Sequence, residues 1–136
     1  MRLWHERLIP LLPDIKTSKN KKLNQLSGQH RECCALRGNG WYKKHKTVDY
    51  IHNHPIEYLI AYHIKVMTEM ILRGFSVNHQ WFNYFYRGQN CLPERTISIE
   101  KCMEARKQYP TYKEHNQEYL EECVNNLKQK GIIINL

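Results

Sequence analysis

The sequence of 136 residues lacks several features that mark particular classes of protein. It contains no apolar run long enough to span a bilayer, and its start lacks the apolar core of a signal peptide. Its five cysteines are an odd number without a Cys-x-x-Cys pair, which favours a reduced protein. No strand-like alternation of useful length, repeat or low-complexity segment is present. We therefore expect a cytoplasmic, largely helical protein.

Negative charge is also scarce. Thirteen acidic residues face 21 lysines and arginines, which gives a formal net charge of +8. This excess favours a polyanionic partner, and nucleic acid is favoured over a membrane surface because no strongly amphipathic basic helix stands out. The length fits one domain with a single core over residues 1–136.

Histidines and cysteines give no clear site. Although His45, His52 and His54 lie close together, no cysteine or carboxylate stands at ligand spacing from them, so no metal is predicted. The adjacent Cys33 and Cys34 fit small core residues better than reactive thiols, because no activating motif accompanies them.

Apolar spacing predicts an all-α, compact single-domain protein with about four main helices and long loops. The central core helix should open at Pro55 and close at Arg73-Gly74. Its expected buried stripe is Ile56, Leu59, Ile60, His63, Ile64, Met67, Met70 and Ile71.

Three further helices are predicted. The first runs from about Leu23 to Arg37 and ends where Gly38 and Gly40 supply positive φ angles. A later helix covers Thr96 to Gln108 and packs through Ile99, Cys102 and Met103, and the last follows a capping box at Thr111–Glu114 and runs to about Lys130. Residues 41–54 and 77–93 should form loops with short helical turns.

The segment Leu26–Arg37 is the most informative feature of the chain. It places a carboxylate, two arginines, a histidine and a glutamine on one predicted helix, followed by a glycine- and lysine-rich stretch suited to phosphates. Glu32 fits acid-base chemistry on a polyanion. It also fits a solvated helix residue paired with a cation one turn away.

The sequence Leu26-Ser27-Gly28-Gln29-His30-Arg31-Glu32-Cys33 resembles the Leu-x-x-Glu-x-Arg-Glu-Leu helix of the pyrimidine-dimer DNA glycosylases, the phage endonuclease V type. Gln29 stands at the first Glu of that pattern and Cys33 at its closing Leu. The helix ending in Arg73-Gly74-Phe75 and the segments Tyr86-Arg87-Gly88 and Arg106–Tyr112 are similar to further family segments in the same order.

This resemblance implies a DNA repair glycosylase with abasic-site lyase activity. The amine of Met1 would attack the sugar C1′ of a damaged nucleotide as a Schiff-base nucleophile, and Glu32 would transfer protons. An α-amine, with a pKa of about 7.7–8.0, is more often neutral than a lysine at about 10.4. Met1-Arg2-Leu3 matches the family's mature Thr-Arg-Ile start if Met1 is retained, although Asp14–Lys22 resembles an insertion before Glu32. No cofactor is implied.

The implied partner is double-stranded damaged DNA with an extruded nucleotide, bound by a monomer without membrane contact. The expected DNA contacts are Arg2, Gln29, His30, Arg31, Arg37, Lys43, Lys44, Arg87, Tyr112 and Lys113. Trp4, Trp41 and Trp81 fit either base stacking or the core. Two alternatives stay open: a non-catalytic nucleic-acid-binding protein of the same fold, and a protein-interaction module that uses Trp81–Tyr86.

Overall fold

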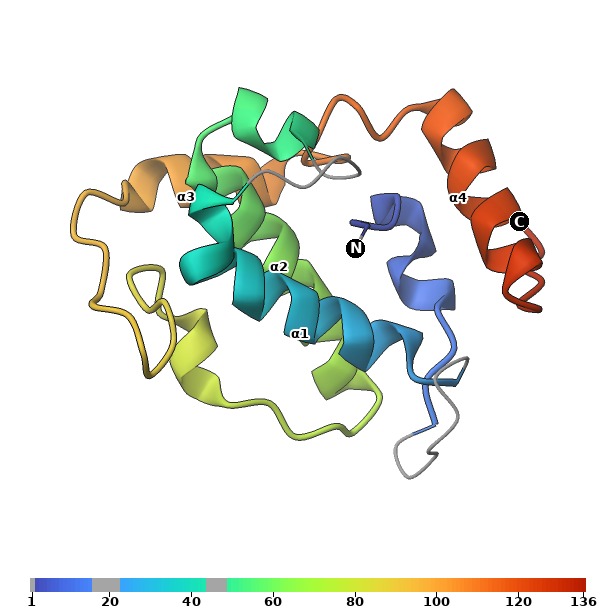
Figure 1. The fold of residues 1–136 in the computed structure, drawn as a ribbon, viewed down its shortest axis with the longest axis horizontal. Helices are drawn as coiled ribbons and strands as arrows, with labels where there is room; N and C mark the ends of the chain where they lie inside the picture. Colours follow the sequence, from blue (N-terminus) through green and yellow to red (C-terminus); the bar gives the residue numbers. More distant parts are fainter. Residues whose placement is uncertain (1, 16–22, 44–48) are drawn as a thin grey trace.

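The computed structural model describes residues 2–15, 23–43 and 49–136. Within these ranges the chain forms four α-helices, α1 (Gln25–Arg37), α2 (Ile56–Leu72), α3 (Ile99–Lys107) and α4 (Gln117–Gln129), as Figure 1 shows. Short 3-10 helices are η1 (Glu6–Leu11), η3 (Asn39–Tyr42), η4 (Asp49–Asn53) and η5 (His79–Phe82). The described residues contain one isolated bridge, between Asp14 and Asn24, and no strand. The predicted all-α class is confirmed.

Helix α2 forms the centre of the fold, with α1, α3 and η1 packed against it (Figure 1). Most of the predicted stripe is buried, but so are Ala61, Tyr62 and Val66 on other sides, whereas Ile71 is 43% exposed. A helix covered on several sides must be apolar around most of its circumference. Among the described helices none is both long and apolar enough to cross a membrane.

Helix α1 begins two residues later than predicted and is anchored at both ends. The carboxylate of Asp14 accepts a hydrogen bond from the backbone N–H of Ser27 at 2.6 Å, which places negative charge at the helix N-terminus. The expectation of positive φ at the following glycines is wrong, because Gly38 has a φ of −88°. Glycine is required at position 40 because of a close backbone contact: a Cβ there would lie 2.6 Å from the carbonyl oxygen of Ala35.

Two expectations for the C-terminal half are corrected by the structure. Helix α3 starts after Ser98, whose hydroxyl accepts from the backbone N–H of Lys101, and it leaves Ile99 and Met103 each 49% exposed. Thr111 does not open a capping box. It is buried, and the N-cap of α4 is Asn116, whose side chain accepts from Tyr119 N–H at 2.9 Å.

The N-terminal segment passes between α2 and α4 (Figure 1). The hydroxyl of Tyr62 on α2 donates to the carbonyl of Trp4, and the hydroxyl of Tyr119 on α4 donates to the carbonyl of Leu3, each at 2.6 Å. Leu3 and Trp4 are buried in the core. The start of the chain is therefore held against the middle of α1, where the candidate site lies.

Candidate active site

A cavity of about 220 Å³ opens between the N-terminal segment, α1 and the end of α4. Its lining residues are Arg2, Trp4, Gln25, Gly28, Gln29, Glu32, Asn126 and Lys130. The four from α1 are spaced three and four residues apart, so they share one face of the helix. Gly28 carries no side chain, and a Cβ there would meet only the guanidinium of Arg31 at 3.7 Å. The cavity thus stays open along α1 toward Glu32.

Glu32 is the carboxylate of this cavity. Its Oε2 accepts a hydrogen bond from the side-chain amide of Gln29 at 3.0 Å. Burial raises the pKa of Glu32, while the nearby backbone of Arg2 and the charges of Lys130 and Arg31 oppose that rise. A half-buried carboxyl with a raised pKa beside a cavity can both accept and return a proton.

Gln29 holds the chain start against Glu32. Its Oε1 accepts from the backbone N–H of Trp4 at 2.7 Å and from the hydroxyl of Tyr62 at 2.9 Å. Its Nε2 donates to the carbonyl of Arg2 at 2.9 Å and to Glu32. With four partners and 1% exposure, this amide has no capacity left for DNA. The expected DNA contact at Gln29 is therefore corrected.

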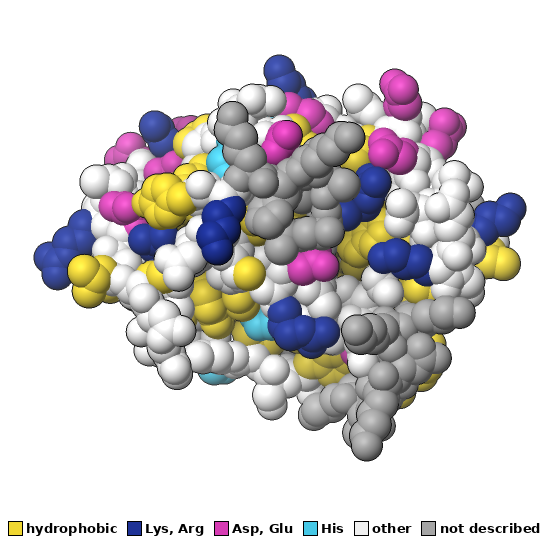
Figure 2. All heavy atoms as spheres, in the orientation of Figure 1, with side chains coloured by type: hydrophobic (Ala, Val, Ile, Leu, Met, Phe, Trp, Pro, Cys, Tyr) yellow, Lys and Arg dark blue, Asp and Glu magenta, His cyan; other side chains and the backbone are white. Residues whose placement is uncertain are grey.

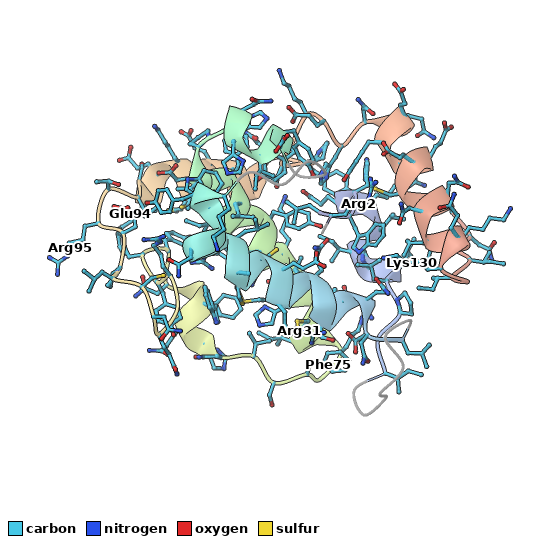
Figure 3. All side chains as sticks on the ribbon, in the orientation of Figure 1. Arg2, Arg31, Phe75, Glu94, Arg95 and Lys130 are labelled. Carbon is cyan, nitrogen blue, oxygen red and sulfur yellow. The ribbon has the colours of Figure 1, made fainter. Side chains whose placement is uncertain are left out.

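Positive groups surround the mouth of the cavity. Arg2 forms an ion pair with Glu122 at 3.3 Å and lies over the ring of Tyr119, and Lys130 lies over the ring of Trp4. Figure 3 labels Arg2 and Lys130 beside α4 and Arg31 on α1, and Figure 2 shows dark-blue groups around a carboxylate on the face in view. Arg31 is exposed.

Two further expected DNA contacts face the interior instead. Arg37 is 1% exposed and donates to the carbonyls of Trp81, Asn83 and Tyr86. Burial lowers its pKa to about 10. Tyr112 is fully buried. Because both side chains are buried, neither can reach a phosphate in this structure. The sequence pattern did not reveal this, since it does not show which face of a segment is covered.

The other predicted residues are spread over the molecule. Arg87 is half-buried and donates to the carbonyls of Arg37 and Gly38. Lys43 shares a second pocket with Arg87, and Lys113 lines a third pocket with Tyr109. Met1 and Lys44, which the sequence analysis also proposed, lie outside the described residues. The structure thus joins Arg2 and Glu32 at one cavity but does not gather all of the proposed residues there.

The sequence analysis missed one cluster of possible metal ligands. His30 and Cys34 on α1 meet His63 on α2, and the three ligand atoms lie within 4.8 Å of one another. The four-residue spacing of His30 and Cys34 was a signal for a shared helix face. The participation of His63, 29 residues beyond Cys34, depends on how α1 crosses α2.

Comparison with known proteins adds a family to this geometry. No curated protein and no solved structure matches the chain. The family model of the pyrimidine dimer DNA glycosylases matches residues 1–83, which include the N-terminal segment, α1 and α2. The chain belongs to the pyrimidine dimer DNA glycosylase family.

Proposed function

We propose that this protein is a DNA glycosylase with abasic-site lyase activity that works through its N-terminal amine. The observation that carries the proposal is the cavity in which Gln29 donates hydrogen bonds to both the backbone carbonyl of Arg2 and the carboxylate of Glu32. This arrangement brings the first residues of the chain, a half-buried carboxylate and a positive surface to one place.

Covalent geometry limits where the amine can lie. Three bonds join the nitrogen of Met1 to that of Arg2, and their lengths sum to about 4.3 Å. The side-chain amide nitrogen of Gln29 donates to both the carbonyl of Arg2 and the Glu32 carboxylate, so the backbone of residue 2 lies beside Glu32. Transfer of a proton between amine and carboxylate, directly or through one water, is therefore within reach of small rotations about residue 1.

The proposed reaction begins when the lone pair of the neutral amine attacks C1′ of the damaged nucleotide. The glycosidic bond breaks and its electron pair leaves with the base. Glu32 removes a proton from the nitrogen and returns it to the sugar oxygen O4′ as the C1′–O4′ bond breaks, and this ring opening gives a protonated imine. Loss of a C2′ proton then expels the 3′ phosphate by β-elimination, and water hydrolyses the imine to release the protein. No oxidant or reductant is needed.

DNA would approach the face that carries the cavity. Arg31 is exposed one residue before Glu32, and Lys130 and Arg2 stand at the cavity itself, so a phosphate backbone could be neutralised on both sides of the carboxylate. C1′ is shielded within an intact duplex, so the target nucleotide must be extruded.

Trapping with borohydride on a duplex that contains one abasic site tests the mechanism. Reduction of the imine should leave a stable covalent adduct, and peptide mapping should place it on the N-terminal residue. Lys130→Arg is the matched control, because among the described residues Lys130 is the lysine that lines the cavity. This variant should be trapped as well as the unchanged protein.

An adduct on Lys130 would overturn the assignment of the nucleophile. Salt-sensitive binding to DNA without any trapped adduct would favour the alternative of a non-catalytic DNA-binding protein. A version with one extra residue before Met1 should lose trapping, because the amine is then displaced from the cavity.

A further inference from the structure

A second polar cluster lies on another side of α1 and is not used by the proposed reaction. His30 and Cys34 are one helical turn apart on α1, and both are half-buried. His63 reaches them from α2 and is fully buried. The Nε2 of His63 lies 2.8 Å from Nδ1 of His30 and 3.8 Å from Sγ of Cys34, and Sγ lies 3.8 Å from either nitrogen of His30.

These distances are close to those of a tetrahedral metal centre. With bonds of about 2.0–2.1 Å to nitrogen and 2.3 Å to sulfur, ligand nitrogens stand about 3.3 Å apart, and nitrogen and sulfur about 3.6 Å apart. The nitrogen–sulfur separations need to change little, and the two imidazoles must separate by about half an ångström. Two imidazoles and a thiolate are the donors that zinc and cobalt(II) prefer.

Without a cation, a hydrogen-bonding proton lies between Nε2 of His63 and Nδ1 of His30, where the cation would bind. The guanidinium of Arg37 donates to Nδ1 of His63 at 3.0 Å, so neutral His63 carries its proton on Nε2 and donates it to His30. A cation at Nε2 requires that proton to move to Nδ1. Arg37 then gives up this one hydrogen bond and keeps those to the carbonyls of Trp81, Asn83 and Tyr86.

We propose that His30, Cys34 and His63 form a binding site for a divalent cation of the zinc class, which joins α1 to α2. Binding converts the Cys34 thiol to a thiolate and releases one proton to solvent. Cys34 also lines a pocket of about 520 Å³ with Gly38 and Trp81, which gives a water molecule access to the fourth coordination position. The proposal does not depend on the lyase mechanism.

Cobalt(II) titration of the whole protein, freed of metal by a chelator and kept reduced, tests the site. One equivalent should produce visible absorption of four-coordinate cobalt and a near-ultraviolet thiolate-to-cobalt band, and zinc should abolish both. The thermal unfolding temperature should rise with zinc. Cys34→Ser should remove the thiolate band, and His30→Gln should weaken binding at least about tenfold.

Cys91→Ser is the matched control, because Cys91 is a half-buried thiol that lines the same pocket but is absent from the cluster. It should bind cobalt like the unchanged protein. Absence of a thiolate band at stoichiometric cobalt would show that the cluster only shares protons, and a band that survives Cys34→Ser would place the metal elsewhere. If Cys34→Ser does not fold, unchanged cobalt binding by His30→Gln overturns the proposal on its own.

Discussion

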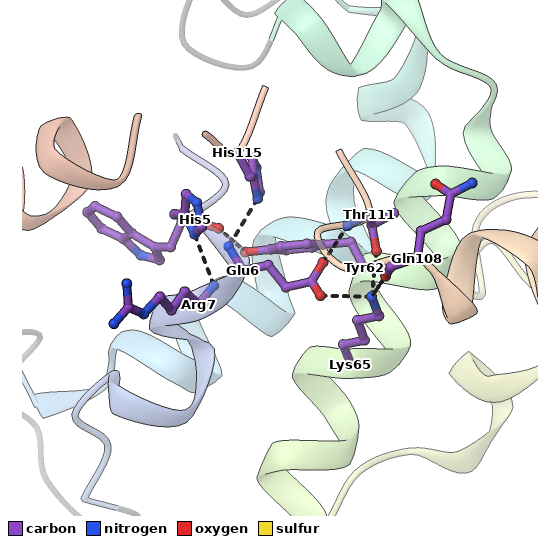
Figure 4. A network of polar contacts seen from close by, with 9 residues as sticks. His5, Glu6, Arg7, Tyr62, Lys65, Gln108, Thr111 and His115 are labelled. Atoms are coloured by element: carbon purple, nitrogen blue, oxygen red, sulfur yellow. Dashed lines mark hydrogen bonds and ion pairs between the residues drawn. The ribbon is translucent and has the colours of Figure 1, made fainter. Parts of the chain in front are cut away.

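Two carboxylates, the buried Glu6 and the half-buried Glu32, lie in contrasting surroundings. The side chain of Glu6 is 3% exposed and fully occupied: Lys65 donates to one oxygen and the backbone N–H of Thr111 to the other, each at 2.8 Å (Figure 4). Glu32 instead faces a cavity, and among the described residues it has no ion pair. Burial alone does not mark a reactive carboxylate. Glu32 differs from Glu6 in lining a cavity, which is what the proposed proton transfer requires.

The largest effect should come from Glu32→Gln. The substitution keeps the shape and removes the proton acceptor, so cleavage of abasic DNA should fall by about 10²–10⁴-fold. DNA binding should remain, since a negative charge near phosphate is removed. Single-turnover cleavage and a binding assay at one salt concentration measure the two effects. Cleavage at the unchanged rate would exclude Glu32 from the chemistry.

Glu6→Gln should have the opposite profile. It leaves the Lys65 ammonium without its carboxylate in a part-buried place, and the free energy of unfolding should fall by about 2–3 kcal/mol because Lys65 keeps some access to water. Urea unfolding measures the loss. Cleavage per folded molecule should stay near that of the unchanged protein. A loss of cleavage as large as that of Glu32→Gln would erase the distinction between the two carboxylates.

Gln29→Glu tests whether the amide positions the chain start. The isosteric change removes both donated hydrogen bonds, to the Arg2 carbonyl and to Glu32, and sets a second carboxyl beside Glu32. We expect kcat to fall by about 10–100-fold with a smaller change in KM, because the amine is misplaced while the DNA surface is intact. If activity fell only in proportion to the fraction of protein that is unfolded, and kcat per folded molecule stayed normal, the role of Gln29 would be purely structural.

His115 makes the Glu6 region sensitive to acid. Burial, followed by the charges of His5 and Lys65, lowers its pKa to about 3. The unfolded state therefore binds a proton that the folded state does not, and stability is lost as pH falls from about 6.5 toward that value. His115→Gln should flatten this loss by up to about 1.4 kcal/mol per pH unit in urea unfolding between pH 7 and 4.

The exposed His79 provides the comparison for that experiment. His79→Gln removes a histidine without changing the buried network of Figure 4, so it separates burial from simple loss of a titrating group. An identical pH profile for the two variants would contradict the assignment to His115.

The smallest effect concerns the positive surface around Glu32. Arg31→Ala should reduce the log–log dependence of DNA affinity on salt by about 0.9, the value for one phosphate contact. Arg95→Ala is the control, because Figure 3 places Arg95 at the far end of the molecule from Lys130. A slope that changes in Arg95→Ala and not in Arg31→Ala would move the DNA surface away from the cavity.

Local patterns in the sequence were sufficient to predict much of the fold. The apolar spacing from Leu59 to Met70 predicted the central helix within one residue at its start, and Gly74 was correctly placed beyond the end of α2. Boundaries set by side-chain caps were less predictable: Asn116, not Thr111, caps α4, because Thr111 is engaged by Lys65 from another helix.

The sequence by itself determined the helical class, the positive charge and the segment from Leu26 to Arg37 on which Glu32 stands, because these follow from residue type and spacing along one helix. Only the tertiary structure decided which polar groups face the interior. Gln29 and Arg37 are on the same helix as Glu32 and look equally suited to bind DNA in the sequence. Gln29 and Arg37 instead donate hydrogen bonds to backbone carbonyl groups from distant parts of the chain, those of Arg2 and Trp81. Glu32, on another part of the same helix, lines a cavity.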